Sequence, residues 1–293
     1  AVWVGTYRQD TQIPVGSATQ ANPNWVVTNI GSVVLTATDS SPGSGLQRAT
    51  YRWDNSDIDN GTYFTNGAII TIPSEGSHQL RVKAWDTAGN TSSVWSGMYQ
   101  QDTVAPVITA NKSSSDWVRS SLGLITISVS DTVPGSGLAV AKYAWENTDV
   151  LTVGTSVSNG GTVSIPGEGD NCLYMMSVDT AGNRSLLGSG RYKVDTQKPV
   201  VSADKTSTVW RTTAIGAITI SVSDGSPGSG LKSTKYRWDN IDLTGGTAVT
   251  NGTTITVPND GDHTLTIQAD DTAGNISDLW QGKYKQDTVA PVI

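Results

Sequence analysis

Apolar and polar residues alternate in short runs that recur along the chain. In residues 32–39, Val33, Leu35 and Ala37 share one face, and residues 125–129 and 218–222 repeat that spacing. Residues 80–84 and 265–269 alternate in the same way. Alternation with a period of two is typical of half-buried β-strands. Turn sequences such as PGSG, NG and TAGN separate the runs, which predicts an all-β fold of about seven short strands per unit in a β-sandwich.

Several motifs recur in a fixed order. DTAGN stands at 86–90, 179–183 and 271–275, and a YxW motif followed by an acid and Asn stands at 51–55, 143–147 and 236–240. A period of about 90 residues matches whole small domains in tandem. We therefore expect three repeats at 10–101, 102–194 and 195–286, with residues 1–9 as the end of a preceding repeat and 287–293 as the start of a following one. On this interpretation the chain is a piece of a longer array.

The composition narrows the classes of function. Charged residues make up only 15% of the chain, and the net charge is −7. A chain without a basic patch is a poor ligand for nucleic acid or for an anionic membrane surface. No apolar run approaches the roughly 18 residues of a membrane span. The single cysteine, Cys172, is interpreted as an incidental strand residue, so no disulfide framework holds the domains.

The ordered motifs support a resemblance. DTxxP is followed by a tryptophan (Trp25, Trp117, Trp210), a strand ending in Asp before SGL, the YxW motif and DTAGN. This order resembles the bacterial immunoglobulin-like repeats of large surface and adhesin proteins, over the whole chain. The resemblance implies tandem immunoglobulin-like sandwiches in an extracellular, cell-surface stalk that carries a distal binding domain. The partners would be neighbouring repeats, the distal ligand stays unknown, and in several such adhesins calcium stiffens the junctions.

Each repeat places two aspartates at one end of the sandwich. Asp39 continues the inward face of its strand, and Asp86 continues that of residues 80–84. In an immunoglobulin topology both strands end at the same tip, where the linker residue Asp10 also arrives. Three carboxylates without a cationic partner repel one another, and Ca²⁺ binds such oxygen ligands. The predicted calcium ligands are Asp10, Asp39, Asp86 and Asn90; Asp102, Asp131, Asp179 and Asn183; and Asp195, Asp224, Asp271 and Asn275.

A second interpretation of the same residues is local turn chemistry. An aspartate at the end of a strand commonly accepts hydrogen bonds from backbone amides of its own turn, and DTAG is a good Asx-turn sequence. On the sequence alone both interpretations stay open. In both, the aspartates have a structural role.

Other functions have weaker support. The only histidines, His78 and His263, lie at equivalent turn positions, and the repeats show no catalytic motif, so we expect no enzyme. The rival is a carbohydrate- or protein-binding module that uses exposed aromatic residues or loop tips. Trp85 is its candidate contact, because its strand position points outward and the other repeats have Val178 and Asp270 there. The repeated tryptophans at 25, 117, 210 and 53, 145, 238 are expected in the core.

Overall fold

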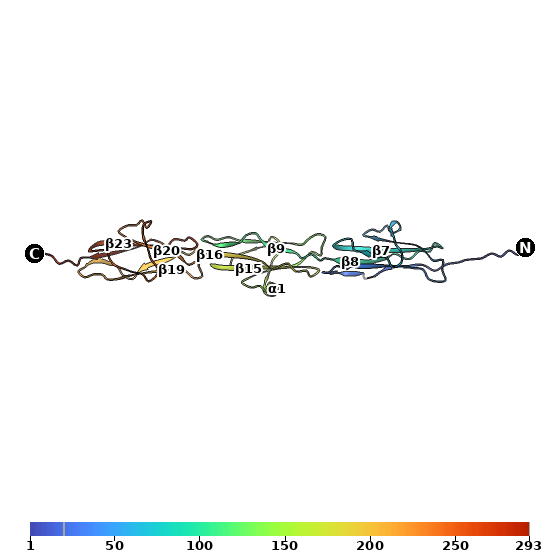
Figure 1. Ribbon diagram of the computed structural model, residues 1–293, viewed down its shortest axis with the longest axis horizontal. Helices are drawn as coiled ribbons and strands as arrows, with labels where there is room; N and C mark the ends of the chain where they lie inside the picture. The colour runs from blue at the N-terminus through green and yellow to red at the C-terminus, as the bar shows by residue number, and fades with distance from the viewer. Residues whose placement is uncertain (20, 293) are drawn as a thin grey trace.

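The computed structural model describes residues 1–19 and 21–292. Figure 1 shows three β-domains in a row along one axis, with the two chain ends at opposite ends of the row. We call these domains repeats 1, 2 and 3, in chain order. The domain boundaries given above stay predictions.

Each repeat consists of one three-stranded and one five-stranded sheet. In repeat 1 the three-stranded sheet has the order β1 (Val15–Ala18), β3 (Ser32–Thr38), β6 (Ile69–Thr71). Its five-stranded sheet has the order β2 (Asn22–Val26), β8 (Trp95–Gln101), β7 (Gly76–Asp86), β4 (Leu46–Trp53), β5 (Thr62–Tyr63). A short 3₁₀ helix, η1 (Ile58–Asn60), follows β4.

Repeats 2 and 3 have the same strand orders. The three-stranded sheets are β14 (Thr162–Val163), β11 (Ile125–Ser130), β9 (Val107–Ala110), and β17 (Val200–Ala203), β19 (Ile218–Ser223), β22 (Thr254–Ile255). The five-stranded sheet of repeat 2 is β10 (Ser114–Val118), β16 (Gly188–Val194), β15 (Gly169–Asp179), β12 (Leu138–Trp145), β13 (Thr155–Ser156). That of repeat 3 is β18 (Ser207–Arg211), β24 (Trp280–Gln286), β23 (Gly261–Asp271), β20 (Leu231–Trp238), β21 (Thr247–Ala248). A single helical turn, α1 (Val150–Val153), occurs in repeat 2.

The strand order confirms tandem immunoglobulin-like sandwiches. In each repeat the first strand pairs with the three-stranded sheet, and the second pairs in parallel with the last strand of the other sheet. All other strand pairs in repeat 1 are antiparallel. The segment after DTxxP is therefore split into two short strands that join opposite sheets.

The core forms between the inward faces of the two sheets. In repeat 1 it includes Val33, Leu35, Leu80 and Tyr99, all fully buried. The Trp53 ring packs edge-on against Tyr99, with ring centroids 5.3 Å apart. Equivalent pairs occur in the other repeats at 5.6 Å and 5.2 Å. Burial raises the pKa of Tyr99 to about 12, and its hydroxyl donates to a backbone carbonyl at 2.6 Å.

The tryptophans at 25, 117 and 210 were expected in the core, but the structure places them outside it. Trp25, Trp117 and Trp210 lie on β2, β10 and β18, which are edge strands of the five-stranded sheets. Trp25 and Trp117 are half-buried, and the Trp210 side chain is 57% exposed. A lysine ammonium lies 6.0 Å from the ring centre of Trp117 and of Trp210. Each of these two rings therefore has a lysine side chain beside it.

Consecutive repeats contact each other through the same loops at both junctions. Gly76, the first residue of β7, lies against Pro134 of the next repeat, and Gly169, the first residue of β15, lies against Pro227. A Cβ built on either glycine would stand 3.1 Å from the proline Cβ, and both glycines have positive φ (118° and 110°). Only glycine combines this backbone conformation with so close an approach. The end of each repeat is therefore shaped to receive the PGSG loop of the next one.

Candidate metal sites at the repeat junctions

One carboxylate cluster lies at the same tip of every repeat. In each, one carboxylate oxygen from each of three aspartates lies within 4.8 Å of the others. The first aspartate comes from the linker, the second follows the second strand of the three-stranded sheet, and the third ends the longest strand. The clusters are Asp10, Asp39 and Asp86; Asp102, Asp131 and Asp179; and Asp195, Asp224 and Asp271. The structure thus brings together the aspartates that the sequence groups.

The linker aspartate is held by the PGSG loop. In repeat 2 the Oδ2 atom of Asp102 accepts a hydrogen bond from the Ser136 amide at 2.6 Å, and Oδ1 accepts one from the Val104 amide at 3.1 Å. The same loop amide reaches the linker aspartate in repeats 1 and 3, at 2.5 Å and 2.6 Å. Both oxygens of this carboxylate therefore have donors, and the linker is tied to the domain that it enters.

The aspartate of DTAGN forms the turn that its sequence suggests. Asp179 Oδ1 accepts from the amides of Gly182 and Asn183 at 2.7 Å and 2.8 Å. The Asn183 side-chain nitrogen donates to Asp179 Oδ2 at 2.7 Å and to the Asp102 carbonyl at 2.8 Å. In all three repeats the asparagine amide nitrogen faces this carboxylate, so the asparagine offers a donor to the cluster rather than the ligand oxygen expected of it. Asx-turn chemistry is thus present within the cluster.

The remaining aspartate of each cluster has oxygens without partners. Among the described residues, Asp39 Oδ1, Asp131 Oδ2 and both oxygens of Asp224 are buried and accept no hydrogen bond. Burial, followed by the negative charge of the linker aspartate, raises the pKa of Asp131 and of Asp224. A buried acceptor without a donor is costly, and a divalent cation would satisfy both the free oxygens and the crowded charge. The donor set, three carboxylates with hard oxygens, fits Ca²⁺.

A second contact at the junction, made by an acidic side chain, was not predicted from the sequence. Glu75, in the turn before β7, accepts hydrogen bonds from the Thr103 amide at 3.0 Å, from its hydroxyl at 2.7 Å and from Gln101 at 3.2 Å. Glu168 holds Thr196 in the same way, at 2.9 Å and 2.6 Å. Asp260 repeats the contact with Thr288. We call this contact the linker clamp. The signal in the sequence was an acid at the same turn position of every repeat, with a DT dipeptide 27 residues later at 102–103 and 195–196.

Trp85 is not the exposed contact that its outward position predicted. Its side chain is 8% exposed, because the Arg48 guanidinium lies 4.0 Å and the Lys83 ammonium 4.8 Å from its ring centre. Lys83 also pairs with Asp59 at 2.9 Å. Cation–π stacking of this kind turns an outward ring into a covered one. A role for Trp85 in ligand contact stays a prediction, and it would require both cations to move aside.

Each of the two histidines lies against the carboxylate of an aspartate in its own repeat. His78 Nδ1 lies 2.7 Å from Asp54 Oδ2, and His263 Nδ1 lies 2.7 Å from Asp239 Oδ2. His78 Nε2 is also 3.1 Å from the Ser74 hydroxyl, an order of groups that hydrolases use. Repeat 3 has Asn259 in place of Ser74, so it lacks the hydroxyl. In repeat 1 the turn that contains Ser74 packs against repeat 2 through Gly76. In both repeats the aspartate also accepts from a backbone amide of the neighbouring strand, which is a structural role.

The comparisons with known proteins give only distant likenesses. A search with protein-family models and a search of curated proteins both return no match. Similar solved structures include the D00-D0 domain of Intimin, at 10% identity and a TM-score of 0.31, covering 61% of this chain and 99% of that one. Three N-terminal domains of the bacteriophage RB49 outer capsid protein Hoc match at 12% and 0.35, covering 96% and 100%.

The EC3-6 cis-dimer structure of protocadherin gammaB7 matches at 12% identity and a TM-score of 0.37, covering 95% of this chain and 76% of that one. At these values the likenesses carry no argument about function. The immunoglobulin-like assignment rests on the strand order described above. No helix in the described part of the chain is long and apolar enough to cross a membrane.

Proposed function

We propose that the chain is a non-catalytic segment of an extracellular stalk on a bacterial cell surface, which holds a distal binding domain away from the cell. The observation that carries this proposal is the repetition of one junction. The linker aspartate, the linker clamp and the contact between glycine and proline recur from repeat 1 to repeat 2 and from repeat 2 to repeat 3. A ligand-binding module needs one distinctive surface, whereas a spacer needs the same joint many times.

Calcium is proposed as the ion of the three clusters. Asp102, Asp131 and Asp179 would hold it at the second tip, and the equivalent aspartates would hold it at the other two. The ion would supply positive charge to oxygens that have no donor. Because the linker aspartate belongs to the same cluster, a bound ion would also fix the angle between linker and domain. Extracellular modules of this type bind calcium with dissociation constants of about 10⁻⁴–10⁻³ M.

The test is thermal unfolding of the chain in about 5 mM calcium and in chelator, with small-angle scattering on the same samples. Binding at these affinities stabilises a site by roughly 1–2 kcal/mol, which raises the midpoint of a domain of this size by about 4 °C or more. We expect that rise together with a longer particle in calcium. Magnesium at the same concentration is the control, because it demands stricter octahedral geometry and dehydrates reluctantly.

The two readouts separate the parts of the proposal. If the midpoint rises and the length does not change, calcium binds but the linker clamp and loop packing already set the stiffness. If neither changes, the clusters are turn chemistry and calcium has no role. A particle that is compact in both conditions contradicts the stalk itself.

A further inference from the structure

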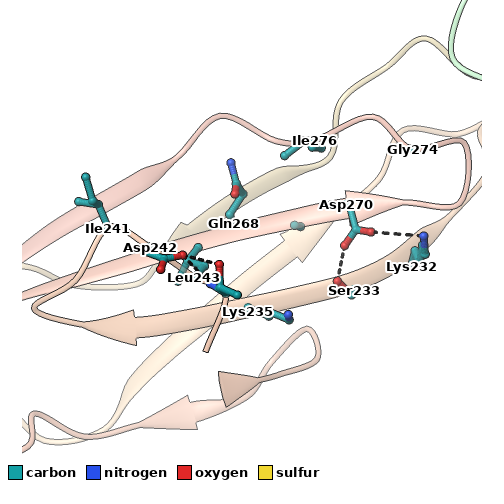
Figure 2. A pocket seen from close by; sticks show the side chains of 12 residues that line it. Lys232, Ser233, Lys235, Ile241, Asp242, Leu243, Gln268, Asp270, Gly274 and Ile276 are labelled. Atoms are coloured by element: carbon teal, nitrogen blue, oxygen red, sulfur yellow. Dashed lines mark hydrogen bonds and ion pairs between the residues drawn. The ribbon is translucent and has the colours of Figure 1, made fainter. Parts of the chain in front are cut away.

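A groove opens on the outer face of the five-stranded sheet in repeat 3 (Figure 2). It encloses about 610 Å³, within the roughly 300–1,000 Å³ of ligand pockets. Its floor consists of residues of β20 and β23, among them Lys235, Gln268 and Asp270. Ile241 lies at one end and Ile276 at the other. None of the cluster aspartates lines the groove, although Gly274 of the DTAGN turn, whose amide donates to Asp271, lies at its edge.

The same place is filled in repeat 1. There the Trp85 ring lies on the sheet beneath Arg48 and Lys83. The equivalent residues in repeat 3 are Asp270, Ser233 and Gln268. These side chains are shorter, and the space that the ring occupies in repeat 1 is open in repeat 3.

The groove contains a lysine whose ammonium has a hydrogen-bond acceptor in repeat 2 but not in repeat 3. Lys142 and Lys235 occupy the same strand position. The Lys142 ammonium donates to the Leu151 carbonyl at 2.8 Å, in the helical turn α1. The loop of repeat 3, residues 239–245, is one residue shorter than residues 146–153 of repeat 2 and forms no helical turn. Within the described residues the Lys235 ammonium has no hydrogen-bond or ion-pair partner, although the side chain is half-buried.

The two carboxylates of the groove, by contrast, already have partners. Asp270 accepts from the Ser233 hydroxyl and pairs with Lys232 at 3.9 Å. Asp242 accepts from the Thr244 amide at 2.9 Å and from its hydroxyl at 2.6 Å. Of the two lysines and two aspartates that line the groove, Lys235 is the one without a partner among the described residues, and an anionic group would complement its ammonium.

The ends of the groove are aliphatic only in this repeat. The Ile241 side chain is 70% exposed and that of Ile276 is 52% exposed. The equivalent positions hold Ser56 and Thr148, and Thr91 and Arg184, in the other repeats. Two exposed isoleucines on either side of a free ammonium define the ligand that would fit.

We propose that this groove binds a peptide segment of a partner protein in which one acidic residue is flanked by aliphatic residues. The acidic side chain pairs with Lys235, and the aliphatic side chains cover Ile241 and Ile276. Repeat 3 is then both a spacer and a lateral attachment point, a role that repeat 1 lacks because Trp85 fills its groove.

The experiment titrates the whole chain with acetyl-Val-Glu-Val-amide and with the matched acetyl-Val-Gln-Val-amide, followed by NMR chemical shifts. We expect the Glu peptide to bind and the Gln peptide to bind at least about tenfold more weakly, because a charge-assisted hydrogen bond is lost. Lys235→Met gives the same loss for the Glu peptide. Lys142→Met, at the equivalent position of repeat 2, leaves its binding unchanged.

A second variant tests whether the peptide binds in the groove, and it leaves Lys235 unchanged. Ser233→Arg, Gln268→Lys and Asp270→Trp together rebuild the filled surface of repeat 1, so the fold has a natural precedent for the change. We expect this triple variant to unfold as one cooperative unit and to lose peptide binding. Equal binding of the two peptides, no binding at several millimolar, or binding of a glucuronic acid disaccharide in place of the peptide would each overturn the proposal.

Discussion

The first carboxylate cluster differs from the second and third in what lies before it. Asp102 directly follows β8 of repeat 1, and its amide donates to the Val26 carbonyl at 3.0 Å. Asp195 has the same contact with Val118 at 2.9 Å, and both aspartates are fully buried. Asp10 follows nine residues to which no strand is assigned, and it remains partly exposed. The same three aspartates thus occur in two environments within one chain.

The tips also differ in which of their aspartates has a shifted pKa. At the first tip, hydrogen bonds from Ser44 and from the Gln12 amide hold the pKa of Asp10 below its usual range. At the second and third tips, burial and the linker carboxylate raise the pKa of Asp131 and Asp224. The second and third tips therefore hold crowded carboxylates next to a fully buried linker aspartate. We infer that a cation stabilises the second and third tips more than the first.

The largest loss of stability is expected when the aspartate of the DTAGN turn is replaced. Asp179→Ala removes the acceptor of three hydrogen bonds from the DTAGN loop, which should destabilise repeat 2 by about 2–4 kcal/mol, because the bonds are charge-assisted and partly buried. Asp86→Ala should cost a similar amount in repeat 1, since its turn has the same bonds to Asn90. Urea unfolding in chelator measures both losses. Asp116→Ala on the exposed face of β10 is the control, and a loss at Asp179 no larger than its loss would contradict the turn assignment.

The linker clamp should give the next largest effect. Glu75→Ala leaves the Thr103 amide and hydroxyl without their acceptor, at a cost of about 1–2 kcal/mol. Because Thr103 lies in the linker, the distance distribution between spin labels on repeats 1 and 2 should broaden. Asp260→Ala is the matched control, since it breaks the same clamp after repeat 3. If both variants leave the distance between repeats 1 and 2 unchanged, the clamp does not set the junction angle.

Charge crowding itself can be relieved by a single substitution. Asp131→Asn removes one of three converging charges, and in chelator it should stabilise repeat 2 by up to about 1 kcal/mol. In calcium the same variant should lose most of the gain that the ion gives the wild type. Asp39→Asn at the first tip should change the midpoint less in either condition, which calorimetry of both variants would show. Destabilisation by Asp131→Asn in chelator would mean that the carboxylate has donors that the structure does not show.

The sequence predicted the arrangement wherever the strand pattern alone decides it. Alternation placed Asp39 and Asp86 on inward faces, because successive side chains of a strand point to opposite faces of the sheet. The repeated motifs then placed the equivalent aspartates of the other two repeats. Trp85 was misjudged, since its burial depends on Arg48 from another strand, which parity does not describe. The clamp at Glu75 was missed because its partner lies in the linker. The free ammonium of Lys235 follows from a one-residue difference in loop length, whose effect needs coordinates.

The smallest effect, and the one that best separates a metal site from a turn, is the dependence of stability on pH. The folded-state pKa values of Asp131 and Asp224 are raised above 3.8, so their contribution is fully present below about pH 4 and is lost as pH rises through the raised values. In chelator, the wild type should therefore gain stability relative to Asp131→Asn as pH falls from 7 to 4, by less than about 1 kcal/mol. In calcium the relative slope should reverse, because protons compete with the ion for the same oxygens. Midpoints measured at both pH values, with and without calcium, test this reversal, and parallel slopes in the two conditions would leave the clusters as turns without an ion.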